Sequence, residues 1–316
     1  MPKRILITGA NGFIGRHLTR HLLEAGYSVV GAVRSRNSTK EHGLLGDVEL
    51  RESGVLSKQT CWNSIVRDVD VVIHLAAAVH MNISTPLTHY FDVNYEATRN
   101  LAASCVTAGI SRMIFLSTIG VMGRSSGSIP FNVMQPVNPV GAYAESKYRA
   151  ELTLQQTAIE SGMEIVIIRP PLVYGPSCKG NFTRLLSLVD SGVPLPFASV
   201  HNKKSLVSVW NLCDLIGACV LHPLGGSQVF LVADGEDIST PDLISRLGAL
   251  LRRPVRLIPV PVALLKVLGS ISGQRNALDK MVDPLQVDIG YTRGLLGWTP
   301  PLCLDEGLAR TVSAYR

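Results

Sequence analysis

The sequence has little that would indicate a metal site or a nucleic-acid-binding surface. Its six cysteines are scattered, without a C-x-x-C pair and without histidines at the spacing of a zinc site. The net charge is +6, but the cations are spread out and form no basic stripe interleaved with aromatic residues. We therefore expect no bound metal and no nucleic-acid partner. An acidic small substrate or an ordinary, mildly basic surface can explain the charge.

Long apolar runs and targeting segments are also lacking. The longest apolar stretch, Ile258 to Ile271, is interrupted by Pro261, Lys266 and Gly269 and is too short to span a bilayer. It favours a core or lobe-packing helix over one that lies on a surface. The amino terminus leads directly into the first expected strand and leaves no room for a signal peptide. We expect a cytoplasmic protein without stable membrane insertion.

The composition is that of an ordered globular protein. Of the 316 residues, 46% are hydrophobic and 17% are charged, without low-complexity segments. This length allows a large core, and we expect two unequal lobes.

Short apolar runs alternate with helical periodicity over the first 170 residues. Expected strands are Arg4–Thr8, Ser28–Val33, Val48–Glu52, Val71–Leu75, Arg112–Ser117 and Glu164–Arg169. Expected helices lie at about 13–26, 57–67, 88–109 and 142–162. This order predicts an α/β fold with a doubly wound parallel sheet of the Rossmann type, which binds ligands at the carboxyl ends of its strands.

Prolines punctuate the chain after Arg169 and strands become sparse, which marks the start of a second, smaller lobe. The stretches Ser205–Val209 and Val229–Val232 still have the character of buried strands, so we expect the chain to return to the sheet there. Residues 1–170, with return segments near 205–232, are expected to form the sheet domain. Residues 171–204 and 233–316 are expected to form an interleaved carboxyl-terminal lobe.

A glycine pattern follows the first expected strand directly, in Thr8-Gly9-Ala10-Asn11-Gly12-Phe13-Ile14-Gly15. Gly9 and Gly12 permit a tight turn that brings backbone amides against a pyrophosphate, and Gly15 lets the next helix pack closely on the sheet. We therefore expect the sheet domain to bind NAD(P) and the second lobe to bind substrate. The expected cofactor contacts of this turn are Gly9, Asn11, Gly12, Phe13, Ile14 and Gly15.

The end of the second expected strand lacks the acidic residue that often binds the adenosine ribose. The segment there is Gly31-Ala32-Val33-Arg34-Ser35-Arg36. Arg34 lies about twenty residues after the glycines, where a guanidinium can clamp a 2′-phosphate. This favours NADP, and a surface arginine beside an NAD site remains the alternative.

Tyr143 and Lys147 lie at positions i and i+4 of the expected helix 142–162, so their side chains share one face. A neighbouring cation favours an ionised phenol, and we expect Lys147 to make Tyr143 more acidic. Such a tyrosine can take or give the proton of a carbinol while hydride moves to or from a nicotinamide, whose ribose Lys147 can hold. Ser117 and Thr118, at the end of the fifth expected strand, can hydrogen-bond the reacting oxygen.

These features together resemble the extended short-chain dehydrogenases/reductases, a branch rich in nucleotide-sugar epimerases, dehydratases and reductases. The resemblance covers essentially the whole chain and includes His74-Leu75-Ala76-Ala77, Asn94 in Val93-Asn94-Tyr95, Arg169 to Pro176, and Leu296-Gly297-Trp298-Thr299-Pro300. It implies three catalytic residues, Thr118, Tyr143 and Lys147. Further implied cofactor contacts are Leu75, Ala76, Ala77, Ser117, Tyr143, Lys147, Pro170 and Val173, and the implied substrate contacts are His80, Thr118, Asn181 and Lys204.

The resemblance leaves three reactions to compare. A 4,6-dehydratase of this family needs an Asp-Glu pair directly after the threonine, but Ile119-Gly120 follows here, which disfavours dehydration. A 4-epimerase and a 4-ketoreductase use the same site at C4 of a sugar. Arg34 favours the reductase. So does a likeness, in Lys179 to Phe182 and Asn202 to Ser205, to bacterial polysaccharide-cluster proteins that reduce UDP-4-keto-6-deoxy-N-acetylglucosamine to UDP-N-acetylquinovosamine.

We therefore expect an NAD(P)-dependent 4-ketoreductase that acts on a UDP-4-keto-6-deoxyhexosamine for cell-surface polysaccharide synthesis. The alternative is a UDP-glucose 4-epimerase. A remoter alternative is a regulator that binds NAD(P) without catalysis, although such proteins usually lose the tyrosine or the lysine. The segments 88–109 and 142–162 resemble the dimer-forming helices of the family, which implies a homodimer.

Overall fold

The computed structural model describes residues 3–36, 48–79, 86–223 and 225–316. The larger of two sheets has seven strands in the order β3-β2-β1-β4-β5-β6-β9, and all its neighbouring strands are parallel. Its strands are β1 (Arg4–Thr8), β2 (Ser28–Val33), β3 (Glu49–Glu52), β4 (Val71–His74), β5 (Arg112–Leu116), β6 (Glu164–Arg169) and β9 (Ser227–Leu231). The strand order reverses between β1 and β4, where doubly wound sheets bind ligands. The predicted fold class is confirmed.

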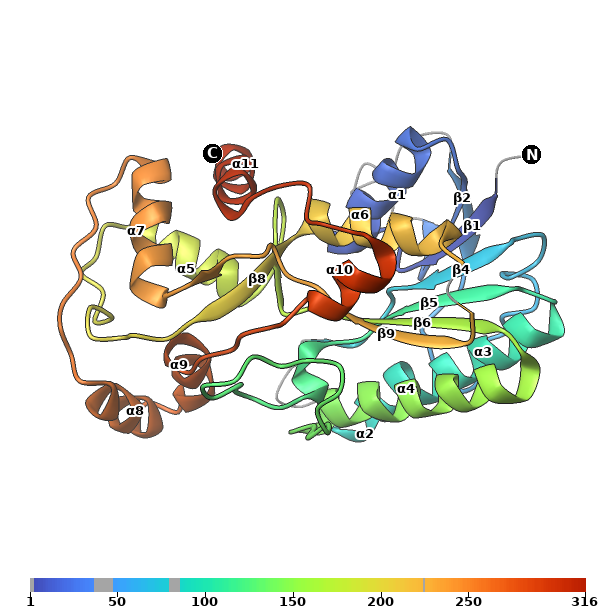
Figure 1. Cartoon of the computed structure of the whole chain (residues 1–316), viewed down its shortest axis with the longest axis horizontal. Coiled ribbons are helices and arrows are strands. Elements are labelled where there is room, and N and C mark those ends of the chain that lie inside the picture. Colours follow the sequence, from blue (N-terminus) through green and yellow to red (C-terminus); the bar gives the residue numbers. More distant parts are fainter. Residues whose placement is uncertain (1–2, 37–47, 80–85, 224) are drawn as a thin grey trace.

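Helices cover both faces of this sheet (Figure 1). One face carries α1 (Phe13–Glu24) and α6 (Val209–Leu221), and the other carries α3 (Ala97–Thr107) and α4 (Ala142–Ser161). In β1, Ile5 and Ile7 join the hydrophobic cluster on the α1 side, while Leu6 joins the cluster on the α3 side. Burial on both faces explains the nearly continuous apolar sequence of the central strands.

The predicted helix at 57–67 is wrong, because this segment forms a series of turns. The Asn100 side chain takes a carbonyl group that a helix would pair within itself. Asn100 Nδ2 donates to the carbonyl of Thr60 at 2.7 Å, which a helix over 57–67 would pair with the amide of Ser64. The apolar spacing reflects side chains such as Trp62, which is buried in the core from a turn.

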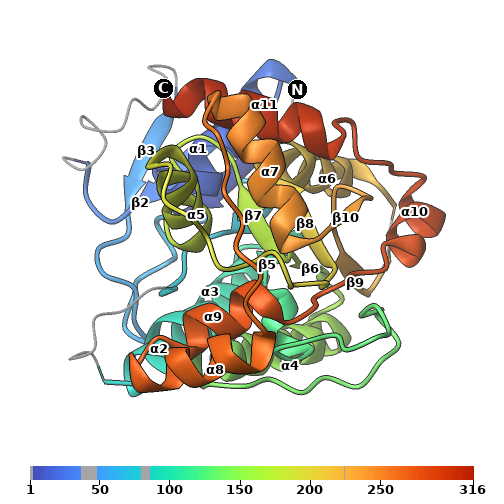
Figure 2. The ribbon, with the colours of Figure 1, turned by 90° about the vertical axis from the view of Figure 1, so that its left-hand side faces the viewer.

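The second lobe is built on a three-stranded sheet of order β10-β8-β7. Its strands are β7 (Leu172–Tyr174), β8 (Lys204–Ser208) and β10 (Asp237–Ile238). The later helices are α5 (Asn181–Asp190), α7 (Thr240–Leu251), α8 (Val262–Ile271), α9 (Arg275–Val282), α10 (Gly290–Leu296) and α11 (Leu304–Tyr315). Figure 2 views the molecule from the side of this lobe, with α5 and α7 in front of the small sheet.

The predicted return of Ser205–Val209 to the large sheet is wrong. This segment forms β8, which pairs in parallel with β7 and antiparallel with β10. Pro170 and Pro171 separate β6 from β7, and because proline cannot donate to a ladder the chain leaves the large sheet there. The prediction for Val229–Val232 holds, since β9 pairs with β6 at the edge of that sheet.

The apolar stretch that ends at Ile271 forms α8, which is buried on one side only. Leu265 is buried, whereas Leu264, Val267 and Leu268 are about half exposed. Leu265 packs in the hydrophobic cluster of the second lobe, so the prediction of a lobe-packing helix is confirmed, although the opposite face of α8 is exposed. Within the described ranges, no helix has the length and apolar character needed to cross a membrane.

Candidate active site

The glycine turn between β1 and α1 has the geometry of a dinucleotide cradle. Gly9 adopts φ +69°, and its amide donates to the carbonyl of Ala32 in β2 at 3.0 Å. A Cβ at Gly15 would lie 2.2 Å from the Gly9 carbonyl oxygen, so only glycine lets α1 approach the turn this closely. Gly12 is exposed at the amino terminus of α1, where amide groups without intrahelical partners can bind a phosphate. The other predicted residues of this turn, Asn11, Phe13 and Ile14, lie beside it and are partly buried.

A buried hydrogen-bond network supports this turn. His74, at the end of β4, has Nδ1 2.6 Å from Thr8 Oγ1 and Nε2 2.9 Å from Thr98 Oγ1. Burial, aided by the charge of Lys147, lowers the pKa of His74 to about 3, so the ring is neutral. Thr8 Oγ1 also accepts from the Ala76 amide at 3.2 Å. The network therefore fixes Ala76 against the glycine turn, between Leu75, whose amide donates to the Thr8 carbonyl at 3.3 Å, and Ala77, the third predicted residue after β4.

Asn94 ties the loop after β4 to helix α4. It is buried in a π-helical turn (Asp92–Glu96), which lies between α2 (Thr88–Phe91) and α3. Its Oδ1 accepts from the Ala78 amide at 2.8 Å, and its Nδ2 donates to Ser146 Oγ at 3.1 Å. Ser146 Oγ donates in turn to the carbonyl of Tyr143 at 2.8 Å. The first turn of α4 is thus held relative to the dinucleotide cradle.

Tyr143 and Thr118 are brought together at the carboxyl edge of the sheet. Burial, with a contribution from Tyr90, raises the pKa of Tyr143 to about 12, and a hydrogen bond with Thr118 only partly opposes this rise. The Tyr90 ring packs edge-on against Tyr143 with centroids 6.0 Å apart. The prediction that Lys147 makes Tyr143 more acidic is therefore wrong for this structure. Desolvation prevails, and the phenol keeps its proton at neutral pH.

Lys147 is buried between α4 and the sheet. Its Nζ lies 4.0 Å from the centre of the Phe115 ring. Burial lowers the pKa of Lys147 to about 7, and the charge of Glu151 acts in the opposite direction. The side chain is thus close to the point where it changes its charge at neutral pH.

Glu151 belongs to a buried cluster that the sequence did not reveal as part of the site. Arg169 Nη2 lies 2.6 Å from Glu151 Oε2, and Ser117 Oγ donates to Glu151 Oε1. Ser117, predicted to contact the cofactor, is therefore buried with its hydroxyl engaged. The available signal was the position of Glu151 four residues after Lys147, together with an arginine at the end of a strand.

The other predicted cofactor residues lie around the same edge. Arg34 directly follows β2 and is exposed, two residues beyond Ala32, which binds the glycine turn. The carbonyl of Pro170 accepts from the Ile119 amide at 2.9 Å, which links the end of β6 to the turn after Thr118. Val173 is partly buried in β7.

The predicted substrate residues belong mainly to the second lobe. Asn181 begins α5 and Lys204 begins β8, whereas His80 lies outside the described residues. Burial lowers the pKa of Lys204 to about 8, against the charge of Asp283. In the part of the chain that the structure describes, no hydrogen bond or ion pair joins Asn181 or Lys204 to the predicted catalytic residues, and their roles stay predictions.

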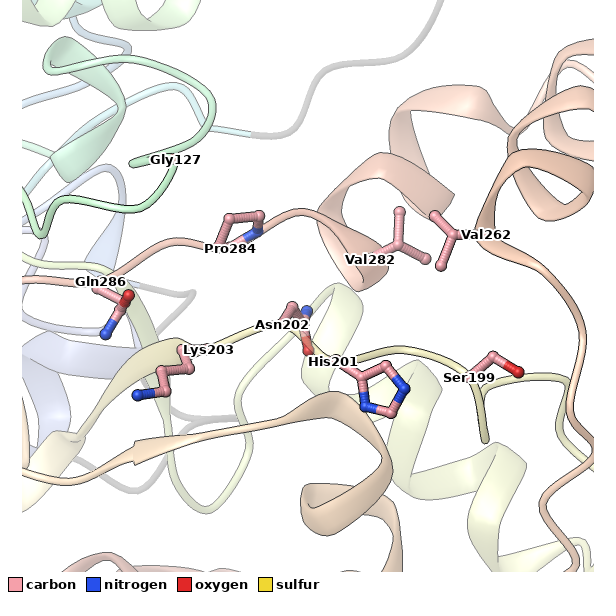
Figure 3. Close-up of a pocket in the computed structure, with 9 residues that line it drawn as sticks. All are labelled: Gly127, Ser199, His201, Asn202, Lys203, Val262, Val282, Pro284 and Gln286. Carbon is pink, nitrogen blue, oxygen red and sulfur yellow. The ribbon is translucent and has the colours of Figure 1, made fainter.

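A hollow of about 420 Å³ is lined in part by Lys203, the residue before β8 (Figure 3). The segments before β8 and after α9 run side by side there, because the Leu285 amide donates to the Lys203 carbonyl at 2.9 Å. Gly127 comes from the loop after β5, so the hollow joins that loop to the second lobe. Its lining residues are Gly127, Ser199, His201, Asn202, Lys203, Val262, Val282, Pro284 and Gln286.

Relatives of known name cover the whole chain. A UDP-glucose 4-epimerase of Vibrio cholerae is 41% identical over 321 residues, which cover 100% of this chain and 96% of that protein. The N-acetyl-alpha-D-glucosaminyl-diphospho-ditrans,octacis-undecaprenol 4-epimerase of Escherichia coli O157:H7 is 26% identical, with 99% and 95% of the two chains covered.

Solved structures share the fold. The UDP-glucose 4-epimerase of Thermotoga maritima, crystallised with UDP-glucose, has a TM-score of 0.81 at 22% identity and covers 99% of this chain and 98% of its own. The UDP-glucuronic acid 4-epimerase of Bacillus cereus, in complex with NAD, has a TM-score of 0.80 at 22% identity and 98% coverage of both chains. Residues 5–211 match the model of the NAD dependent epimerase/dehydratase family. With this match and the relative from Vibrio cholerae, the chain belongs to the NAD dependent epimerase/dehydratase family.

Proposed function

We propose that this chain is a UDP-hexose 4-epimerase of the UDP-glucose 4-epimerase type. The observation that supports this most is the position of Thr118, just after β5, and of Tyr143, in the first turn of α4, at the edge of the sheet where the glycine turn lies. The 41% identity to the UDP-glucose 4-epimerase of Vibrio cholerae favours the epimerase over the 4-ketoreductase that the sequence alone favoured.

The residues at this edge fit a dinucleotide. The glycine turn and the amino-terminal amides of α1 would hold the pyrophosphate, and Lys147 would hold the nicotinamide ribose. Glycine is needed because a side chain at Gly15 would occupy the space of the turn itself. NAD held there would supply reversible hydride transfer at C4 of the sugar, which is chemistry that no side chain supplies.

Tyr143 would move the proton of the oxygen at C4. Because the phenol is protonated at neutral pH, it is ready to donate to a ketone oxygen. Donation converts the phenol to a phenolate, which an ammonium on Lys147 would stabilise. In the opposite direction this phenolate accepts the proton of the 4-hydroxyl group and becomes the phenol again. Thr118 would hydrogen-bond the same oxygen and orient it toward Tyr143.

The second lobe would bind the nucleotide diphosphate. Lys204, with a pKa of about 8, is mostly charged at neutral pH and suits a phosphate oxygen. Asn181 would donate an amide hydrogen bond from the start of α5. The likeness to proteins named for UDP-sugars makes UDP the proposed nucleotide.

The residues after Thr118 disfavour dehydration. Ile119 is 4% exposed and Gly120 has no side chain, so neither position offers an acid or a base for the removal of water from the sugar.

A 4-ketoreductase is the second candidate, and two observations favour it. Arg34 is exposed where an acidic residue would favour NAD, so the site suits the 2′-phosphate of NADP. The protonated phenol of Tyr143 matches the proton that a ketone needs on reduction. A non-catalytic NAD(P)-binding regulator is less consistent with a site that retains both Tyr143 and Lys147.

Cofactor retention and product analysis separate these candidates. The purified protein is denatured, and the released nucleotide is identified by mass spectrometry. The epimerase predicts tightly held NAD⁺ and interconversion of UDP-glucose and UDP-galactose without added cofactor. The reductase predicts an empty site and loss of NADPH absorbance with a UDP-4-keto-6-deoxyhexosamine. Binding of NADPH without turnover of either substrate would support the regulator.

A homodimer through α3 and α4 is the proposed assembly. Leu152 and Ile159 of α4 are 47% and 78% exposed, and Val106 of α3 is 38% exposed. Such an apolar surface on neighbouring helices is typical of a subunit contact. Light scattering of the eluted protein should give twice the chain mass, and Ile159→Glu should reduce it to the chain mass.

A further inference from the structure

The exposed face of α8 is apolar. Leu264, Val267, Leu268 and Ile271 are 48%, 54%, 51% and 79% exposed. Their spacing of three and four residues places them on one side of the helix. The other side is buried against α9 through residues such as Leu265. In a globular protein the apolar side of a helix normally faces the core, so this arrangement marks a contact surface.

This surface lies at an end of the molecule. Figure 1 shows α8 at the far end of the second lobe, and the segment 252–261 runs along the same end from α7 to α8. Figure 2 looks onto this end, with the segment and α8 both in front. Ile258 of this segment is 46% exposed and adds to the apolar surface.

The same part of the chain concentrates positive charge. Residues 252–283 contain six arginines and lysines and two aspartates, and three of the cations, Arg253, Lys266 and Arg275, pair with a carboxylate. Arg256 and Lys280 are exposed, and neither forms a salt bridge among the described residues. Lys266, in the middle of α8, instead pairs with Asp283 at 2.7 Å, which leaves the apolar face free of charge.

We propose that α8 docks this protein onto the surface of an anionic lipid bilayer. Leu264, Val267, Leu268 and Ile271 would enter the boundary between headgroups and acyl chains, while the exposed cations Arg256 and Lys280 would lie against the anionic headgroups. Short helices with one apolar face and a cationic rim bind membrane interfaces in this way, without spanning the bilayer. A second copy of the chain fits less well, because two such surfaces would bring like charges together.

Co-sedimentation of the full-length protein with vesicles tests this proposal. We expect binding to vesicles of phosphatidylethanolamine and phosphatidylglycerol, weaker binding at high salt, and little binding to phosphatidylcholine alone. The double variant Leu264→Gln with Leu268→Gln should bind the anionic vesicles with an affinity lower by a factor of about ten or more, since the buried apolar area sets the affinity. Leu221→Gln, at a 57% exposed leucine of α6, should bind as the wild type does.

A second pair of variants tests the cationic rim and does not touch the apolar face. Arg256→Gln with Lys280→Gln should weaken binding to the anionic vesicles, while Arg20→Gln on the exposed surface of α1 should not. The proposal is overturned if the wild type binds neither kind of vesicle, or if both double variants bind as well as the wild type. It is also overturned if the leucine variant changes the oligomeric mass, because α8 is then a contact between copies.

Discussion

Glu151 and Arg169 form a buried ion pair, with 2.6 Å between Oε2 and Nη2, and Glu151 lies one helical turn after Lys147. Their side chains are 1% and 6% exposed. The carboxylate raises the pKa of Lys147, while burial of the lysine lowers it and prevails. The charge of Lys147 therefore depends on a pair that does not itself reach the substrate.

Glu151→Gln should lower the pKa of Lys147 below its present value of about 7, because the opposing negative charge is lost. If catalysis needs the ammonium, the alkaline limb of the pH profile of kcat/KM moves to lower pH. The variant also leaves Arg169 buried without its partner, at a cost of about 3–5 kcal/mol in unfolding free energy.

Glu145→Gln is the matched control for this experiment. Glu145 pairs with Arg149 on the exposed side of the same helix. Loss of this exposed pair should lower the unfolding free energy by about 0–1 kcal/mol and leave the pH profile of kcat/KM unchanged. An unshifted profile in folded Glu151→Gln would show that the pair plays no part in the charge of Lys147.

Lys147→Met should stabilise the fold and abolish activity. The pKa of Lys147 is lowered from 10.5 to about 7, so between these values the unfolded chain binds more protons than the folded chain. Wild-type stability therefore rises with pH in this window, by at most about 1.4 kcal/mol per unit. The variant should therefore exceed the wild type in stability most at neutral pH and less at alkaline pH.

Thermal unfolding of both proteins across this window measures the difference. Lys58→Met, at an exposed lysine, should show no pH-dependent difference. A Lys147→Met protein that melts below the wild type at neutral pH would mean that the buried lysine stabilises the fold.

Gly15→Ala should prevent cofactor binding and destabilise the fold. The added Cβ would lie 2.2 Å from the Gly9 carbonyl oxygen, so the turn or α1 must shift, at a cost of about 1–3 kcal/mol. Gly294→Ala is the control, because nothing lies within 4 Å of its Cβ position in α10. Its unfolding free energy should rise by up to about 1 kcal/mol, because alanine favours a helix more than glycine does. Isothermal titration with NAD⁺ and denaturant unfolding check both variants, and wild-type affinity in Gly15→Ala would contradict this account of the turn.

Arg34→Ala tests the cofactor preference. If the guanidinium binds a 2′-phosphate, the variant should lose about tenfold to a hundredfold in NADPH affinity and keep its NADH affinity. Fluorescence titration measures both constants, with Arg20→Ala as an exposed-arginine control. If the dissociation constants of NADPH and NADH change equally and only slightly, Arg34 does not favour NADP.

Most of the sheet could be predicted because it depends on local signals, whereas Thr118 was assigned to the site of Tyr143 through its place at the end of a strand and the family resemblance. Apolar runs, glycines at a turn and helical spacing require no knowledge of distant contacts. The turns around Trp62 could not be predicted, since Asn100 takes a carbonyl there from another part of the chain. The pairing of β8 could not be predicted either, because its partners β7 and β10 come from separate parts of the chain.

The pKa values of the site residues could not be predicted from the sequence either. The spacing of Tyr143 and Lys147 indicated an acidic phenol, but the sequence does not show how deeply either group is buried. Burial raises the pKa of Tyr143 to about 12 and lowers that of Lys147 to about 7. The role of Glu151 became visible only when the fold placed Arg169 and Ser117 around it.

The most direct test of the central claim is proton NMR of UDP-glucose incubated with the wild type and with Tyr143→Phe, without added cofactor. The account predicts that UDP-galactose accumulates with the wild type. With the variant, the rate should fall by about a hundredfold to ten-thousandfold, at unchanged melting temperature and cofactor content. Absence of UDP-galactose with the wild type, or a wild-type rate in Tyr143→Phe, would contradict it.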